Sequence, residues 1–162
     1  MSLAINTVKP KNTERWVHYT DSEDKVLASF LVRNIGFKSY RVALERANNQ
    51  IASKGFDVDS ADKNDKLFHE LILDAVACHL IVDWKGLVDE EGKDIIFTTE
   101  KAKEILTFGD IGMLIWHFVR DEAQKLQDEI DKERFEILGK SENSTNGQKS
   151  EAQQDETQSN EP

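Results

Sequence analysis

The chain has 162 residues, enough for one domain of ordinary size or at most two small ones. Its 31 acidic residues outnumber its 21 basic ones, and the net charge of −10 argues against a surface that neutralises nucleic-acid phosphates. The single cysteine, Cys78, excludes an intramolecular disulfide and any site with several cysteine ligands. Because no apolar run approaches the roughly 20 residues that cross a bilayer, and the N-terminus does not resemble a signal peptide, we expect no membrane association and a cytosolic location.

The N-terminal third of the body predicts a β-hairpin. Residues 1–12 are expected to fray, because Pro10 interrupts a short alternating apolar pattern. Residues 15–19 and 25–33 are rich in aromatic and β-branched side chains, and the polar turn 20–24 separates them. Two strands alone are marginal, so we expect helices to cover one face of this hairpin.

Two helices are predicted next. Residues 37–53 carry apolar side chains at helical spacing, and Gly55 is a plausible stop. After a polar connector at 57–65, apolar pairs recur every four residues from Leu67, which predicts a central helix that ends near Asp83.

The remaining elements are shorter, except for the last. Residues 84–97 hold two glycines around an acidic turn and predict a small hairpin or compact loop pinned by Trp84. Thr98 or Thr99 can cap a helix that runs through Leu106. A final helix is expected from about Asp110, with an apolar stripe that thins in its C-terminal third, so this end is expected to project from the body. The stripe consists of Ile111, Leu114, Ile115, Phe118, Val119, Ala123, Leu126, Ile130 and Ile137.

Together these elements predict an α+β protein, mainly α, in which an N-terminal hairpin packs on about four helices. The folded domain is expected to span residues 13–138. Residues 139–162 contain one member of the hydrophobic class, Ala152, and five acidic residues against two lysines, so they cannot offset the entropy of ordering. We expect them to form a disordered acidic tail.

No pattern of residues predicts catalysis, a metal site or a cofactor. His69 and His79 lie ten residues apart on one predicted helix, too far around it and along it to share a metal. The acidic segments that start at Asp57 and Asp89 lack the later positions of a calcium-binding loop. Nucleotide-binding, hydrolase and metalloprotease signatures are absent, and Cys78 is most simply a small core residue. We therefore expect a protein that is not an enzyme.

Two features are more typical of binding. Phe108, Met113, Trp116 and Phe118 make the start of the last helix apolar on more than one face, so they form a candidate surface for a partner or for another copy of the chain. The alternative is that neighbouring helices of the same chain cover every face. A basic cluster, formed by Arg33, Lys38, Arg41 and Arg46, is either a contact for an acidic partner or a solvated helix face.

Residues 25–120 resemble a known family. An apolar helix runs into Asp83, Trp84 and Gly86, and an acidic turn with Gly92 follows. The segment Glu100 to Leu106 then has the pattern E-x-A-x-x-x-L. This order is similar to that of the tail assembly chaperones of long-tailed bacteriophages of the siphovirus type.

The resemblance implies a function. Such chaperones are non-enzymatic, bind the long hydrophobic tape measure protein, assist tail tube polymerisation in the host cytoplasm and are absent from the mature virion. In many relatives, a ribosomal frameshift makes a longer form that recruits the tail tube protein. The motif residues Asp83, Trp84, Gly86 and Gly92 are expected to be structural, since Trp84 would pack the turn and the glycines permit positive φ. A different class of function stays open, an acidic regulator or inhibitor that mimics nucleic acid and occupies a basic partner.

Overall fold

The computed structural model describes residues 12–54 and 67–142. The expectations for residues 1–11, for the connector at 57–65 and for residues 143–162 of the tail lie outside the described residues. Residues 139–142, the predicted start of the tail, are instead the end of the last helix. Within the described residues the chain is an α+β structure, mainly helical, with an N-terminal hairpin packed on helices, which confirms the predicted fold class.

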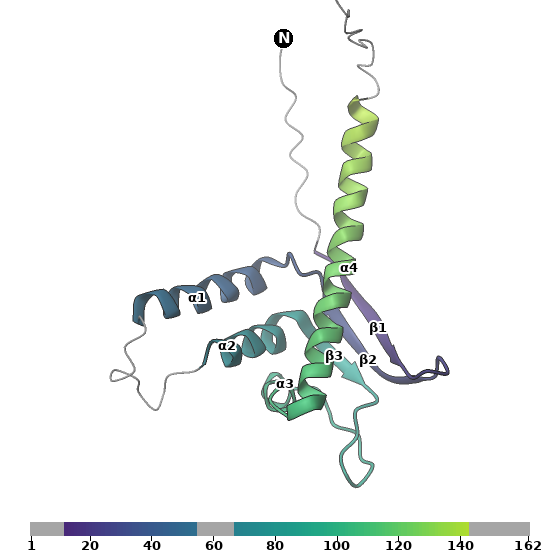
Figure 1. Cartoon of the computed structure of the whole chain (residues 1–162). Coiled ribbons are helices and arrows are strands. Elements are labelled where there is room, and N and C mark those ends of the chain that lie inside the picture. The colour runs from purple at the N-terminus through teal and green to yellow at the C-terminus, as the bar shows by residue number, and fades with distance from the viewer. Residues whose placement is uncertain (1–11, 55–66, 143–162) are drawn as a thin grey trace, which may run out of the picture.

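A three-stranded antiparallel sheet forms one side of the body (Figure 1). Strands β1 (Glu14–Thr20) and β2 (Val26–Arg33) make the predicted hairpin, and Trp16 lies opposite Leu31. Strand β3 (Ile81–Lys85) adds to the free edge of β2, with Trp84 opposite Phe30. The third strand supplies the additional pairing that a lone hairpin lacks.

Strand β3 corrects the sequence prediction, which continued the preceding helix to about Asp83. The helix instead runs from Phe68 to Ala75 (α2), widens into a π-helical turn at Val76–Leu80 (η2), and passes directly into the strand. The N–H of Ile81 donates to the carbonyl of Val76, five residues earlier. A short apolar run fits a helix or a strand equally well by periodicity, and here the open edge of β2 gives residues 81–85 their hydrogen-bond partners.

The other helices follow the predicted order. Helix α1 spans Lys38–Lys54, and α3 spans Thr99–Leu106. The Thr98 hydroxyl accepts a hydrogen bond from the N–H of Lys101 at 3.0 Å, which confirms the predicted cap. The predicted small hairpin at 84–97 is also present, because Val88 bridges Asp94 and the N–H of Ile95 donates to the carbonyl of Leu87.

The last helix, α4 (Gly109–Glu142), is the longest element, about 50 Å at 1.5 Å per residue. Its buried hydrophobic residues are Ile115, Val119, Ala123, Leu126 and Ile130. They pack α4 against β1, β2 and η2, while its C-terminal part extends away from the body, as the thinning stripe predicts (Figure 1). Three residues of the predicted stripe, Ile111, Leu114 and Ile137, are instead 65%, 45% and 51% exposed.

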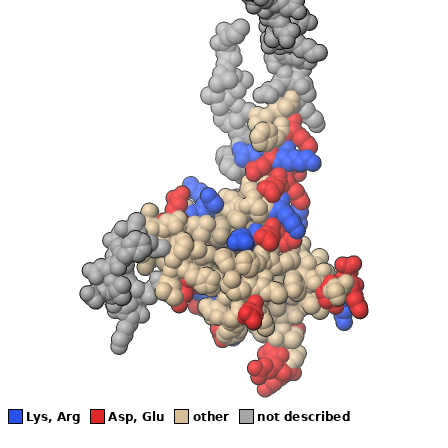
Figure 2. Space-filling view, viewed as in Figure 1, with Lys and Arg blue, Asp and Glu red and all other residues tan. Residues whose placement is uncertain are grey.

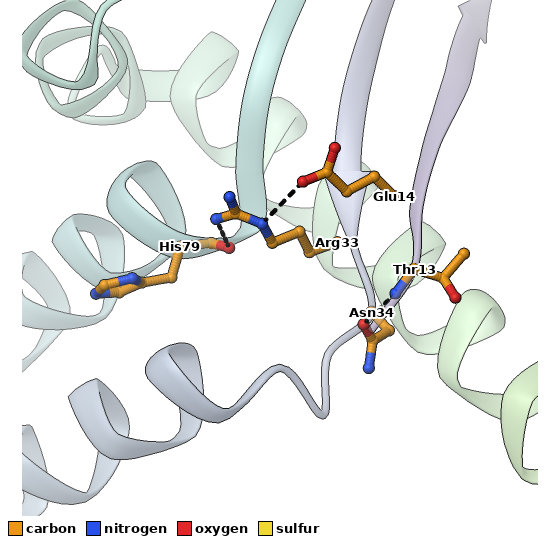
Figure 3. Close-up of polar contacts among 5 residues, drawn as sticks. All are labelled: Thr13, Glu14, Arg33, Asn34 and His79. Atoms are coloured by element: carbon orange, nitrogen blue, oxygen red, sulfur yellow. Dashed lines mark hydrogen bonds and ion pairs between the residues drawn. The ribbon is translucent and has the colours of Figure 1, made fainter. Parts of the chain in front are cut away.

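Asn34 joins the hairpin to α4, and it is the one buried polar side chain among the described residues. Its Oδ1 accepts the N–H of Thr13 at 3.2 Å (Figure 3), and its Nδ2 donates to Gln127 Oε1 at 2.7 Å. The same Gln127 oxygen accepts the N–H of Gly36 at 3.0 Å, and the N–H of Ile35 donates to the carbonyl of Ala123. These bonds hold the connection between β2 and α1 against one side of α4. They also give the polar groups of that connection their hydrogen-bond partners.

Substituting Asn34 is expected to destabilise the fold. Asn34→Ala removes both side-chain bonds and leaves the N–H of Thr13 without its partner, so the free energy of unfolding should fall by about 2 kcal/mol. In a double-mutant cycle measured by urea denaturation, the effects of Asn34→Ala and Gln127→Ala on the free energy of unfolding should deviate from additivity by at least ~0.5 kcal/mol. Gln124→Ala, which removes an exposed bond to Asp128 on the same helix, is the control and should stay within about 0.5 kcal/mol of wild type. Additive effects of Asn34 and Gln127 would contradict the network.

Candidate partner-binding groove

An apolar groove of about 290 Å³ opens where the hairpin end, the segment after β3 and the start of α4 meet. Its rim consists of exposed apolar residues. Exposing apolar side chains to water does not stabilise the isolated chain, so a cluster of them indicates a binding surface. Leu27 comes from β2, Val88 from the small hairpin, and Ile111 and Leu114 from α4. The exposed fractions of these four side chains are 49%, 52%, 65% and 45%.

Aromatic rings form the floor of the groove. Phe118 from α4 makes an edge-on contact with Tyr19 from β1, with ring centroids 5.3 Å apart, and a tilted contact with Phe30 from β2 at 5.9 Å. The buried Phe30 and the partly buried Phe118 belong to the hydrophobic core. The floor is therefore part of the packed core, whereas the rim residues extend into solvent.

The four residues predicted as a partner surface do not form one surface. Phe108 and Met113 are exposed, at 53% and 39%, whereas Phe118 lies in the floor of the groove. Trp116 faces α2, where its ring packs edge-on against His69 at 5.6 Å and under the guanidinium of Arg120 at 5.2 Å. Leu27, Val88, Ile111 and Leu114 were not predicted as a group, because only the tertiary structure brings these three segments together.

Of the motif residues, Gly86 lines the groove, and Asp83 and Trp84 support the segment that leads to it. The Trp84 side chain is 5% exposed, its Nε1 donates to the carbonyl of Ile95 at 2.6 Å, and its ring meets Phe97 edge-on at 4.9 Å. Gly86 has a φ of +85° and lies so close to β2 that an added Cβ would stand 2.8 Å from the carbonyl oxygen of Leu27. Asp83 accepts the backbone N–H of Trp84 at 2.8 Å. These contacts fix the segment after β3 against the hairpin.

Two turns of identical construction flank the groove. In the turn at residues 21–25, Asp21 Oδ1 accepts the N–H groups of Glu23 and Lys25, and the fourth residue, Asp24, has a φ of +61°. In the turn at residues 89–93, Asp89 Oδ1 accepts the N–H groups of Glu91 and Lys93. Its fourth residue, Gly92, has a φ of +79°. In each turn the backbone N–H of the first residue also donates to the carbonyl of the fifth residue. The first turn lies between Tyr19 and Leu27, and the second follows Val88; all three of these residues line the groove.

Both turns are acidic. Residues 21–25 hold three carboxylates and one lysine, and residues 89–94 hold four carboxylates and one lysine. In Figure 2 one of these turns forms a red tip to the right of the body, and the other forms a red tip below it. Asp110, at the start of α4, adds another carboxylate next to Ile111. The groove is therefore apolar inside and negative at its margins.

Two members of the predicted basic cluster line a hollow, and a third is engaged within the fold. Arg33 pairs with Glu14 at 3.3 Å, donates to the carbonyl of His79 at 3.2 Å (Figure 3), and lies over the ring of Phe37. Lys38 and Arg46 instead line a shallow hollow beside the His79 side chain. Burial, and secondarily the charge of Arg33, lowers the pKa of His79 from its ordinary value.

In the described parts of the chain, no three His, Cys, Asp or Glu side chains gather so that they could hold a metal ion. The described helices also include none long and apolar enough to span a membrane. The groove thus offers binding surface and no array of titratable groups inside it, since its lining residues are apolar apart from the hydroxyl of Tyr19.

A family model for the YdaY prophage proteins matches residues 35–140, which is more than half of the chain. The chain belongs to the YdaY prophage protein family. No curated protein and no solved structure matches it. The family match includes the groove residues from the segment after β3 and from α4, and it begins just after the hairpin that supplies Tyr19, Leu27, Ala28 and Phe30.

The twin turns give a matched test of backbone strain. Asp24→Gly is expected to raise the free energy of unfolding by about 0.5–1 kcal/mol, because glycine adopts a positive φ without steric cost. Gly92→Ala is expected to lower it by about 1–2 kcal/mol for the same reason, since an added Cβ there meets no atom within 4 Å and the cost is purely conformational. Urea denaturation measures both. A destabilising Asp24→Gly would contradict the equivalence of the turns.

The fold should lose stability in mild acid through His79. In the unfolded chain His79 titrates near pH 6.5, and burial lowers its pKa in the fold, so the unfolded state binds more protons as the pH falls below about 6.5. The free energy of unfolding therefore decreases from that pH downward, until the folded form is protonated too. His79→Gln should flatten this slope in urea titrations between pH 7 and 5. His117→Gln is the control, since it removes a histidine from the exposed side of α4, and an equal effect of both would contradict the role of burial.

Proposed function

We propose that this prophage-family chain is a non-enzymatic tail assembly chaperone that binds the tape measure protein and assists tail tube polymerisation. The observation that carries the proposal is the exposed apolar rim formed by Leu27, Val88, Ile111 and Leu114. Membership of a prophage protein family and the resemblance of residues 25–120 to phage tail chaperones support it.

The chemistry of such a chaperone suits this chain. A tape measure protein exposes long apolar helices before the tube forms around it, and an apolar groove can cover part of such a helix. A net charge of −10 would keep the complex soluble and limit self-association. In this proposal the chain acts in the host cytoplasm and is absent from the mature virion, and a longer frameshifted form would recruit the tail tube protein.

The alternative, an acidic inhibitor that mimics nucleic acid, needs carboxylates arrayed on one surface. The projecting part of α4 mixes both signs (Figure 2), for example where Lys125 pairs with Glu122 at 3.0 Å and Arg15 from β1 pairs with Glu129. This mixture favours a groove-based function over mimicry.

Co-expression with the tape measure protein tests the proposal. Wild-type chain should bring the tape measure protein into the soluble fraction and be recovered with it at low and at high salt. Ile111→Asp with Leu114→Asp should reduce this recovery at least tenfold, because burying each side chain contributes about 1.5–3 kcal/mol and 1.4 kcal/mol is a factor of ten.

The matched control is Ile137→Asp, at the far end of the same helix, where the isoleucine is 51% exposed and away from the groove. It should leave recovery unchanged. The proposal fails if the tape measure protein is equally soluble without the chain, or if only a basic partner is captured and high salt removes it.

A further inference from the structure

The groove and its two acidic turns together specify the chemistry of a partner. We propose that the groove binds a cationic amphipathic helix of another protein, with apolar side chains in the groove and Lys or Arg side chains against the turns at 21–25 and 89–94. The inference rests on the proposed function only in taking the tape measure protein as the natural source of that helix.

The volume of the groove limits what enters it. A cavity of 150 Å³ holds one benzene-sized group, so about 290 Å³ accommodates roughly two large apolar side chains. Residues three or four apart on a helix present two such side chains on one face. The exposed Leu27 and Val88 on one side and Ile111 and Leu114 on the other would then pack against the flanks of the helix.

The charges on the rim select the sign of the partner. Asp21 and Asp89 are used within the turns, where each accepts two backbone N–H groups. Glu23, Glu90 and Asp94 extend the negative charge outward from the same turns, and they are exposed. Negative charges in the two turns next to an apolar groove favour a partner with Lys or Arg beside its anchoring side chains, and they disfavour acidic helices.

The acidic turns beside the groove also disfavour other molecules that could bind there. A second copy of this chain, with its net charge of −10, would bring acidic surface toward the acidic turns. A nucleic acid or an anionic lipid surface would meet the same repulsion. A cationic helix alone satisfies both the apolar rim and the charges.

Two designed 18-residue peptides provide the probe. Both place leucines on one face of a helix; one has lysines and the other glutamates on the remaining positions. Fluorescence anisotropy with the full chain should show binding of the Leu/Lys peptide and at least tenfold weaker binding of the Leu/Glu peptide.

Charge-reversed variants locate the contact. Glu23→Lys with Glu90→Lys should weaken binding of the Leu/Lys peptide at least fivefold in 20 mM salt and much less in 500 mM salt, because added salt screens exposed charges. Glu133→Lys with Glu136→Lys changes the net charge by the same amount at the projecting end of α4 and should have little effect. Ile111→Asp should weaken binding at both salt concentrations.

Each result decides the inference. Equal weakening by the two charge-reversed pairs would overturn it, since attraction would then follow net charge alone. A concentration-dependent dimer in analytical ultracentrifugation that Ile111→Asp abolishes would also overturn it, because a second copy would cover the groove. Specific peptide binding without tape measure solubilisation would retain this inference and reject the proposed function. Solubilisation that needs Ile111 but tolerates the Glu23 and Glu90 changes would do the reverse.

Discussion

The contact between Asn34 and Gln127 is the constraint on which the arrangement of the body depends. Asn34 and Gln127 are 93 residues apart in the sequence, yet their side chains meet at 2.7 Å. The Asn34 oxygen also accepts the N–H of Thr13, and the Gln127 oxygen also accepts the N–H of Gly36. A buried amide must find partners of fixed geometry, whereas apolar packing alone tolerates sliding. The network therefore sets where along α4 the hairpin sits, and so where the first turns of α4 reach the end of the sheet.

The groove is a consequence of that placement. Once α4 is fixed near Gln127, its first three turns run past the hairpin end, and Ile111 and Leu114 extend beyond the surface that the sheet can cover. Trp84 completes the site from the other side by holding the segment after β3 through its bond to Ile95 and its contact with Phe97. The motif that resembles phage tail chaperones thus supports the groove, and Gly86 is its one member that lines it.

The twin turns connect local stability to recognition. Each uses one aspartate to satisfy two backbone N–H groups and one residue of positive φ to close the loop. Such turns need little support from the core, so their outer side chains are available to carry charge. In the proposed complex the two features would have separate tasks, with apolar contact in the groove supplying affinity and the charge of the turns selecting the partner and speeding encounter.

The sequence by itself determined the hairpin, the helices and the cap at Thr98, because these depend on periodicity and on local hydrogen bonds. It failed at Ile81 to Lys85, since an apolar run of that length suits helix and strand alike and only the free edge of β2 favours the strand. Of the predicted partner surface, Phe108 and Met113 are exposed, while Trp116 packs on His69 and Phe118 forms the floor of the groove. Which side of an apolar helix stays exposed is decided by how many neighbours reach it, and that number is a property of the tertiary structure.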